Sequence, residues 1–318
     1  MINSRKCAIV GVGSVGATTA FSLKHSALFS EILLIDINRK RATGEAMDLG
    51  HALPFLSPAE VYAGDYEDLK DAAVIIIAAG AAQAPGETRL DLVRKNTVIF
   101  HTVLGDICKY NTEALLLIVT NPVDILTEVA RRISGFPKER VIGSGTVLDT
   151  ARLKFLLGRH LGVDARQVHA FIIGEHGDTE LPVFSSANIS GIDLDHFCHS
   201  QYKYCDEGDL QRLFEQTRDA AYGIIEAKGS TYYAVAEAVR RIVTAVQRDE
   251  SAILPVSVCA DGAYGLEGLC LSLPCIVGAG GVQHVLEIPL SEKERERLLY
   301  SAMRMRRVLD ALSTECLV

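Results

Sequence analysis

The sequence predicts an α/β protein with an N-terminal doubly wound domain on a parallel sheet and a C-terminal α+β domain. In the first half, short apolar runs alternate with longer segments of helical pattern. These runs are apolar on both faces, which is typical of strands in a parallel sheet covered by helices. The alternation is less regular in the second half, so we expect two domains, residues 1–145 and residues 146–318.

Four strands and three helices are expected in the first domain. The strands are the β-branched apolar runs at residues 6–10, 32–37, 74–79 and 115–119. The helices lie between them, at residues 17–26, 40–49 and 90–109. In the second domain we expect a strand at residues 168–173 and helices at residues 149–161, 210–228 and 232–247.

A further helix is expected near the C-terminus. Ser291 and Glu294 have the spacing of a capping box, in which each side chain accepts a hydrogen bond from the other residue's backbone amide. The apolar residues that follow recur at helical spacing and predict one buried stripe, formed by Leu298, Ala302, Met305, Leu309 and Leu312. The stripe indicates a contact with the core or with another subunit.

The composition excludes several classes of function. The formal net charge of −8 argues against nucleic acid or anionic membranes as partners, because neither is attracted over long range. No stretch has the roughly 20 apolar residues that span a bilayer. The eight cysteines include no Cys-x-x-Cys pair and no His/Cys ligand spacing, so we expect reduced thiols, a cytoplasmic location and no bound metal.

A glycine-rich turn follows the first expected strand and opens a helix. Gly11, Gly13 and Gly16, with Val15 between the last two, form a G-x-G-x-x-G string that allows a tight turn and close approach of a pyrophosphate. Asp36 ends the next strand, where a carboxylate accepts hydrogen bonds from ribose hydroxyls and repels a 2′-phosphate. The pattern therefore predicts a Rossmann domain that binds NAD rather than NADP; the alternative is a tight turn beside a surface aspartate.

A histidine stands between glycines in the loop-forming string at residues 173–178. His176 has Asp149 and Arg152 available from a preceding segment. A carboxylate beside an imidazole fixes its tautomer and stabilises its cation, and an arginine offers a forked grip for a small carboxylate. These residues predict a site that holds a small organic acid and exchanges a proton with it. The alternatives are a loop histidine bonded to backbone and a helix arginine in a weak local pair.

Four strings carry a family resemblance: residues 80–93, 120–124, 144–152 and 174–178. Together, and in this order, they resemble the lactate/malate dehydrogenase family, and within it the NAD-dependent L-lactate dehydrogenases. The resemblance extends from Gly11 to the C-terminal helix. It implies reversible hydride transfer between NADH and pyruvate, giving L-lactate in glycolysis and fermentation, by a homo-oligomer expected to be a tetramer.

The resemblance also implies roles for the charged residues. His176 is the implied proton donor and acceptor, and Asp149 its orienting partner, since an imidazolium can give a proton to a carbonyl oxygen near neutral pH. Arg152 matches the residue that grips the substrate's carboxylate. Arg89 matches the arginine of a mobile loop that closes over the substrate and polarises its carbonyl.

Three further positions match the family's substrate and cofactor contacts. Asn121 resembles the asparagine near the nicotinamide and the substrate. Thr231 matches the threonine that lines the substrate pocket, and Val235 the apolar residue against the nicotinamide. A helix-cap threonine and a core valine are the alternatives for the last two.

Gln83 is the residue that the resemblance makes decisive for the substrate. Malate enzymes of the family have an arginine at this loop position, where it pairs with the second carboxylate of oxaloacetate. A neutral glutamine cannot compensate that charge in a closed site, where an unpaired ion is costly. We therefore expect pyruvate as the substrate, although Ala84 departs from the lysine of many bacterial relatives.

A regulatory site is a further expectation from the resemblance. Many bacterial relatives bind fructose 1,6-bisphosphate between subunits through an arginine and a histidine. Here His169 matches the histidine, but Lys154 replaces the arginine and lacks its bidentate fork. The alternative is an ordinary pair at a subunit interface.

For the whole chain, the rival functions are a malate or other 2-hydroxyacid dehydrogenase and a non-catalytic NAD-binding structural protein.

Overall fold

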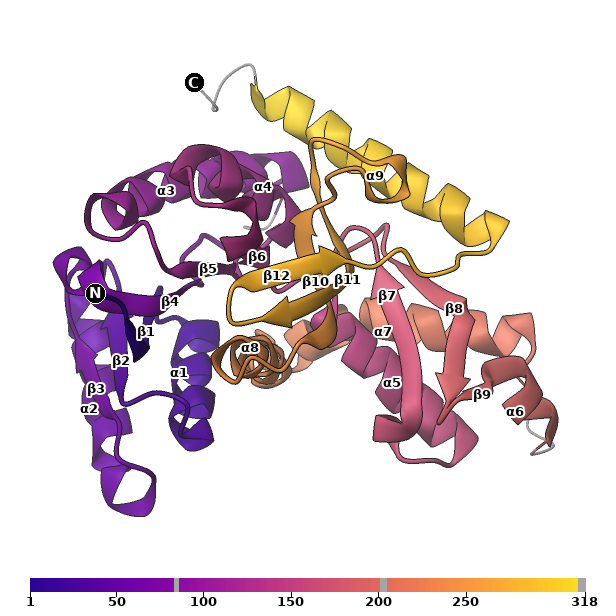
Figure 1. The fold of residues 1–318 in the computed structure, drawn as a ribbon, viewed down its shortest axis with the longest axis horizontal. Coiled ribbons are helices and arrows are strands. Elements are labelled where there is room, and N and C mark those ends of the chain that lie inside the picture. The colour runs from indigo at the N-terminus through magenta and orange to yellow at the C-terminus, as the bar shows by residue number, and fades with distance from the viewer. Residues whose placement is uncertain (83–85, 201–204, 314–318) are drawn as a thin grey trace.

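The protein is described here from a computed structural model that covers residues 1–82, 86–200 and 205–313. Its centre is a nine-stranded sheet in the order β12-β11-β10-β6-β5-β4-β1-β2-β3 (Figure 1). Six strands of this sheet come from the first half of the chain and run parallel to one another. They are β1 (Asn3–Val10), β2 (Glu31–Ile35), β3 (Glu60–Ala63), β4 (Ala72–Ile77), β5 (Leu115–Ile118) and β6 (Val141–Gly143).

Helices connect these parallel strands, as the sequence pattern predicts. The helices are α1 (Ser14–Ser26), α2 (Arg39–His51), α3 (Arg89–Tyr110) and α4 (Val123–Ser134). The first three lie where they were expected, whereas α4 was not predicted. Its first eight residues are all buried. The sequence nevertheless carries a helical signal that the prediction missed, because polar residues recur at helical spacing: Asp124, Thr127, Glu128, Arg131 and Arg132.

The second predicted strand was too long at its C-terminal end. β2 ends at Ile35, and the backbone amide of Asn38 donates to the Asp36 carboxylate at 2.8 Å. This turn takes the chain out of the sheet, so Ile37 is fully exposed although it is apolar.

A smaller antiparallel sheet, β7-β8-β9, lies in the second half of the chain. Helices α5, α6 and α7 pack beside it and enclose a second hydrophobic core (Figure 1). The elements are α5 (Val147–Leu161), β7 (Val168–Ile173), β8 (Leu181–Ile189), β9 (Ile192–Asp193), α6 (Leu194–Ser200) and α7 (Glu207–Lys228). The strand and the two longer helices were predicted, and β8, β9 and α6 were not.

Three strands of the second half extend the first sheet. They are β10 (Ala252–Cys259), β11 (Cys270–Gly278) and β12 (Gly281–Val285), and β10 pairs antiparallel with β6 through Ser257 and Gly143. Backbone hydrogen bonds therefore cross the boundary expected at residue 145. The sequence reading did not foresee this arrangement.

Two long helices complete the fold. α8 (Tyr233–Gln247) packs against α1, and α9 (Glu292–Ser313) lies across the end of the molecule, in yellow in Figure 1. The predicted capping box before α9 is confirmed: Ser291 donates its backbone amide to Glu294 at 2.8 Å, and Glu294 donates its own to the Ser291 hydroxyl at 3.3 Å. The predicted apolar stripe of α9 is buried. Short 3₁₀ helices lie at η1 (Leu53–Phe55), η2 (Tyr66–Asp71), η3 (Lys138–Arg140), η4 (Ala165–Gln167) and η5 (Ala263–Gly265).

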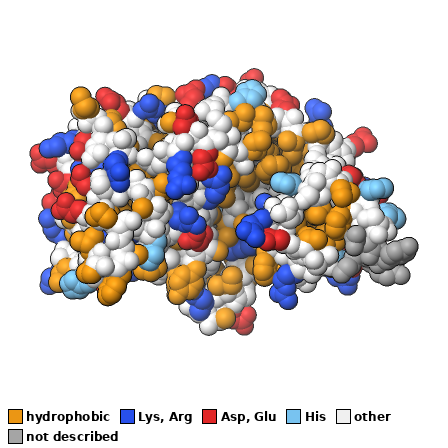
Figure 2. Space-filling view, turned by 60° about the horizontal axis from the view of Figure 1, so that its bottom comes forward, with side chains coloured by type: hydrophobic (Ala, Val, Ile, Leu, Met, Phe, Trp, Pro, Cys, Tyr) orange, Lys and Arg blue, Asp and Glu red, His pale blue; other side chains and the backbone are white. Residues whose placement is uncertain are grey.

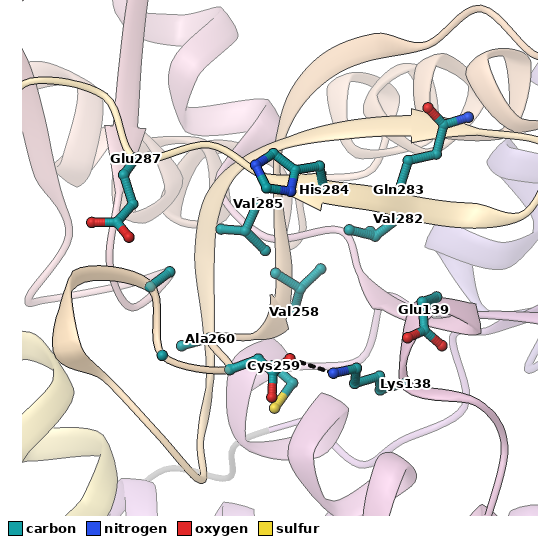
Figure 3. Close-up of a pocket in the computed structure, with 13 residues that line it drawn as sticks. Lys138, Glu139, Val258, Cys259, Ala260, Val282, Gln283, His284, Val285 and Glu287 are labelled. Carbon is teal, nitrogen blue, oxygen red and sulfur yellow. Dashed lines mark hydrogen bonds and ion pairs between the residues drawn. The ribbon is translucent and has the colours of Figure 1, made fainter.

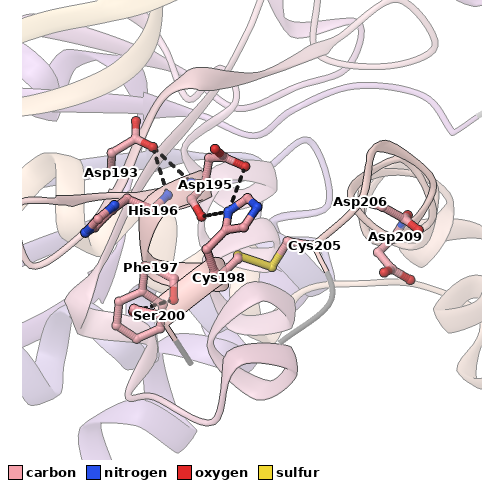
Figure 4. The surroundings of a disulfide bond; sticks show 10 residues. Asp193, Asp195, His196, Phe197, Cys198, Ser200, Cys205, Asp206 and Asp209 are labelled. Atoms are coloured by element: carbon pink, nitrogen blue, oxygen red, sulfur yellow. Dashed lines mark hydrogen bonds and ion pairs between the residues drawn. A yellow bond between two sulfur atoms is a disulfide. The ribbon is translucent and has the colours of Figure 1, made fainter. Parts of the chain in front are cut away.

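One pair of cysteines differs from the expectation of reduced thiols. Cys198, near the end of α6, and Cys205, just before α7, form a disulfide with their Cα atoms 5.9 Å apart (Figure 4). The two cysteines are seven positions apart, and no cysteine motif in the sequence marks them as a pair. The other cysteines of the described residues are free, most of them buried. Within the same described part of the chain, no helix is both long and apolar enough to cross a membrane.

Candidate active site

The glycine-rich turn after β1 has little space for side chains at two of its positions. Gly11 has a φ of +93°, and a Cβ there would lie 2.4 Å from the backbone nitrogen of Ala79. A Cβ on Gly16 would lie 1.9 Å from the carbonyl oxygen of Gly11. These two glycines let the first turn of α1 pack against the ends of β1 and β4.

Gly13 has a different surrounding. It is the N-cap residue of α1, forms no side-chain cap, and a Cβ built on it would meet no atom within 4 Å. The space in front of the helix N-terminus is therefore open, and the helix dipole favours an anion there. This open cradle fits the pyrophosphate of NAD. Val15, in the same turn of α1, is half-buried against the core.

Asp36 fastens the end of β2 to the glycine turn. Its carboxylate accepts the backbone amide of Val12 at 2.8 Å and that of Asn38 at 2.8 Å. Asp36 is only half-buried, so the remaining lone pairs of the carboxylate are accessible to ribose hydroxyls. The residues of this edge thus fit the dinucleotide that the sequence predicts.

His176 lies in the loop between β7 and β8 and is held from two sides. Its Nδ1 atom is 2.6 Å from a carboxylate oxygen of Asp149, which stands in the first turn of α5. Its backbone amide donates to Asp124, in the first turn of α4, at 2.7 Å. The imidazole is oriented by Asp149 and the loop is anchored by Asp124, so Nε2 is the ring nitrogen left for a reaction.

Asp149 also binds the predicted carboxylate-gripping residue. The Arg152 guanidinium donates through one nitrogen to Asp149 at 3.0 Å, one turn along α5. A guanidinium has five N–H donors, so this single bond leaves donors for another partner. The structure therefore brings His176, Asp149 and Arg152 together, as their proximity in the two sequence motifs predicts.

The charges around His176 favour its protonated form. Burial disfavours the imidazolium, but the charge and hydrogen bond of Asp149 outweigh burial and raise the pKa of His176 to about 9. Burial likewise opposes ionisation of Asp149, yet His176 and Arg152 hold the pKa of Asp149 below its ordinary value. At neutral pH the pair is an imidazolium beside a carboxylate, ready to give a proton.

Asp124 is a site residue that the sequence reading did not single out. It is 1% exposed, and besides the His176 amide it accepts the Ser272 hydroxyl at 2.9 Å. Burial raises the pKa of Asp124, and its hydrogen-bond donors act in the opposite direction. The signal in the sequence was an acidic side chain in the first turn of an amphipathic segment, directly after the string at residues 120–124.

A small cavity of about 40 Å³ joins three predicted residues from distant segments. His176, Asn121 and Val235 line it together with Val119, Ser144, Gly145, Leu148 and Ala238. Asn121 follows β5, and the buried Asn96 of α3 donates to its carbonyl at 2.8 Å. The cavity therefore lies at the carboxyl end of the parallel strands, where doubly wound sheets bind their ligands.

Other predicted residues are not brought to this cavity by the described structure. Gln83 lies outside the described residues, and Arg89 is the first residue of α3, with its side chain also outside the description. Thr231 is half-buried in the connection between α7 and α8. Lys154 is half-buried on α5, where burial lowers its pKa, and His169 is exposed on the neighbouring strand β7.

The surface charge is distributed unevenly. Figure 2 shows Lys and Arg side chains, with some Asp and Glu, gathered around a hollow near the middle of one face. The chain as a whole carries a net charge of −8, so this gathering of Lys and Arg side chains contrasts with the negative charge of the rest of the protein. Such a distribution is compatible with an anionic ligand.

A larger cavity, of about 530 Å³, lies between β10, β12 and η3 (Figure 3). Cys259, His284 and Glu287 are among its lining residues, and Lys138 bonds to Asp261 at its edge. None of the predicted site residues whose side chains the structure describes lines it. The chemistry therefore centres on the smaller cavity around His176.

Comparison with known proteins gives matches over nearly the whole chain. Residues 5–143 match the family model for the lactate/malate dehydrogenase NAD binding domain, and residues 146–315 match that for the lactate/malate dehydrogenase alpha/beta C-terminal domain. An L-lactate dehydrogenase of Acetivibrio thermocellus is 51% identical over 308 residues, which are 97% of each chain. One of Thermoanaerobacter pseudethanolicus is 52% identical over 307 residues, covering 96% of this chain and 99% of the relative.

Solved structures agree with these sequence matches. A lactate dehydrogenase enzyme from a Medee basin deep-sea metagenome library superposes with a TM-score of 0.94 at 40% identity, covering 98% of this chain and 100% of that one. The minor L-lactate dehydrogenase from Enterococcus mundtii, in the ligands-bound form, also gives a TM-score of 0.94 at 36% identity, with coverage of 98% and 99%.

Proposed function

The chain belongs to the lactate/malate dehydrogenase family, and from this premise we propose that it is an NAD-dependent L-lactate dehydrogenase. The observation that carries the proposal is the His176–Asp149 couple, with a 2.6 Å bond, beside Arg152 and next to a cavity lined by Asn121. The curated relatives at about half identity bear the same name. The cofactor is NAD, which the glycine turn and Asp36 fit.

The reaction joins pyruvate, NADH and a proton to give L-lactate and NAD⁺. When bound, the cofactor supplies the hydride for the carbonyl carbon. His176 gives the proton from Nε2 to the carbonyl oxygen, because Nδ1 is engaged by Asp149. In the reverse direction neutral His176 accepts the hydroxyl proton of lactate. Asp149 holds the ring in place and stabilises its cation in both directions.

The substrate is held by charged residues on either side of its carbonyl. Arg152 grips the carboxylate with the guanidinium donors that Asp149 leaves unused, and its side chain is still 14% exposed. Arg89 approaches the carbonyl oxygen from the start of α3 and stabilises the negative charge that develops there. Asn121, Thr231 and Val235 complete the substrate and nicotinamide pockets. These roles rest on the family motifs at each position.

Gln83 selects the one-carboxylate substrate. Oxaloacetate brings a second carboxylate, which an uncharged glutamine cannot pair. Steady-state rates with NADH and pyruvate, oxaloacetate or 2-oxoisocaproate test the proposal. The highest kcat/KM is expected for pyruvate; a preference for oxaloacetate would establish a malate enzyme, and one for 2-oxoisocaproate a dehydrogenase of bulkier 2-hydroxyacids.

The protein acts as a cytoplasmic homo-oligomer, expected to be a tetramer, with residues 1–145 and 146–318 as its two domains. Support for subunit contacts comes from large apolar side chains on α2 and η1: Met47 is 58% exposed and Phe55 is 85% exposed.

Lys154 and His169 form the proposed site for fructose 1,6-bisphosphate, where lysine attracts a phosphate as a point charge. An unchanged pyruvate saturation curve and unchanged assembly on adding the bisphosphate would exclude this regulation.

A further inference from the structure

A third carboxyl group lies beside the His176–Asp149 couple. Glu180 follows the His176 loop just before β8 and is 6% exposed. One of its oxygens comes within 4.8 Å of a nitrogen of His176 and an oxygen of Asp149. Nothing in the sequence motifs assigns a role to this residue.

The surroundings of Glu180 are unfavourable for an ionised carboxylate. Its Oε1 atom is buried and has no hydrogen-bond partner among the described residues. An unpaired buried oxygen is much more costly on a carboxylate than on a neutral carboxyl group. The hydrogen bonds that the structure describes for both nearby cations go to Asp149 and not to Glu180: His176 bonds Asp149 at 2.6 Å, and Arg152 bonds the same carboxylate at 3.0 Å.

The balance of charge around the imidazole leads to the same conclusion. Asp149 accepts the hydrogen bonds of both His176 and Arg152, and Asp124 is a second buried acidic group at the same loop. An ionised Glu180 would place a further negative charge against the Asp149 carboxylate. Burial and the charge of Asp149 raise the pKa of Glu180 well above its ordinary value, and the opposing effects of His176 and Arg152 are smaller.

Other groups face Glu180 from the opposite side. A cavity of about 220 Å³ separates it from α7 and α9, and Asp178, Arg218, Arg297 and Tyr300 are among the lining residues. Arg218 bonds Asp219 at 2.8 Å, so its charge is already paired on the surface of α7. Glu180 thus has the catalytic couple on one side and a charged cavity wall on the other.

We propose that Glu180 stands beside the catalytic histidine as a neutral carboxyl group, and that its ionisation at alkaline pH weakens binding of the substrate's carboxylate. The inference rests on the proposed function, because it assumes that Arg152 holds the carboxylate of a 2-oxo acid while His176 protonates its carbonyl. Glu180 touches no reacting atom in this scheme. It is a positioning residue that acts through the local charge.

The two kinetic constants respond differently to this ionisation. A new negative charge near Arg152 opposes a second anion, so KM for pyruvate rises. The same charge favours the imidazolium, so His176 keeps its proton and kcat does not fall. A residue with a purely structural role would not separate KM from kcat along a pH series.

The kinetic test compares the unmodified enzyme with Glu180→Gln between about pH 6 and about pH 8.5, below the pKa of about 9 of His176. Pyruvate KM of the unmodified enzyme is expected to rise toward the alkaline end of this range at nearly constant kcat. In Glu180→Gln the rise should be absent. Glu215→Gln, which removes an exposed carboxylate of α7, is the matched control and should follow the unmodified profile.

The protonation state is tested separately from activity, by infrared spectroscopy. The difference spectrum between unmodified enzyme and Glu180→Gln should contain the carbonyl band of a protonated carboxyl group near neutral pH, and the Glu215→Gln difference should lack it. Absence of the band from the first difference, or identical pH dependence of KM in the two enzymes, would overturn the inference. Thermal unfolding and NADH titration of each variant verify that the fold is retained. If no 2-oxo acid is turned over, the proposed function fails, while the infrared measurement still decides the state of Glu180.

Discussion

Asp149 accepts a hydrogen bond from His176 at 2.6 Å and another from Arg152 at 3.0 Å. One buried carboxylate therefore fixes the proton donor and the carboxylate-gripping residue relative to each other. Because Asp149 and Arg152 are one turn apart on α5, their geometry depends on a single helix. His176 comes from another segment and is brought to them by the loop after β7.

Replacing His176 by Asn removes the proton donor and leaves a side chain of similar polarity. We expect kcat for pyruvate reduction to fall by at least about 10³-fold, because the asparagine amide cannot give a proton to the carbonyl oxygen. NADH affinity should change little, since the glycine turn and Asp36 lie on other elements. Stopped-flow turnover and NADH fluorescence titration measure the two effects. Turnover within tenfold of the unmodified enzyme would contradict the assignment.

Replacing Asp149 by Asn should shift the pH dependence of pyruvate reduction. Asp149 raises the pKa of His176 to about 9, so the imidazolium persists up to that pH. Without this charge the histidine loses its proton at lower pH, and the alkaline fall in kcat/KM should move down by about 1–2 units. A pH profile of kcat/KM for pyruvate provides the measurement. Asp164→Asn, which removes an exposed carboxylate paired with Arg166, should leave the profile in place; an unshifted Asp149→Asn profile would refute the prediction.

Alanine substitutions at two glycines of the turn should have opposite consequences. Gly13→Ala places a methyl group in open space, so the fold should survive while NADH affinity falls by about tenfold or more. Gly16→Ala places a methyl group 1.9 Å from the Gly11 carbonyl oxygen, so the thermal unfolding temperature should fall by several degrees. Calorimetry and NADH titration of both variants separate the two effects. Equal NADH affinity in Gly13→Ala and the unmodified protein would show that the cofactor does not approach this position.

Replacing Gln83 by Arg should move the preference toward oxaloacetate. The added cation can pair the second carboxylate, so the ratio of kcat/KM for oxaloacetate to that for pyruvate should rise by at least about 100-fold. Steady-state kinetics with both substrates give the ratio. Gln83→Asn, which stays neutral, is the control and should retain the preference for pyruvate. An unchanged ratio in Gln83→Arg would show that another residue sets selectivity.

Much of the fold could be predicted because its signals are local. The alternation of apolar strands with helical segments predicted the parallel sheet, and Ser291 with Glu294 predicted the start of α9. The pairing of β10 with β6 could not be predicted, because its partners Ser257 and Gly143 are far apart in the sequence. No short-range pattern records such a pairing, which depends on how complete elements pack. The Cys198–Cys205 disulfide is a different case, because its cysteines are only seven residues apart but belong to no recognisable cysteine motif.

By itself, the sequence determined the glycine turn with Asp36, the likeness to the family, and the candidate pair of His176 and Asp149. Each of the three depends on residues of fixed type at short spacing or on motifs in a fixed order, and none of them needs long-range geometry to be recognised. Only the tertiary structure placed Asp124, 52 residues away, on the backbone of His176 and left Glu180 buried beside the couple. The physical reason is that burial and electrostatic environment arise from packing between distant segments, which decides which of several carboxyl groups are paired.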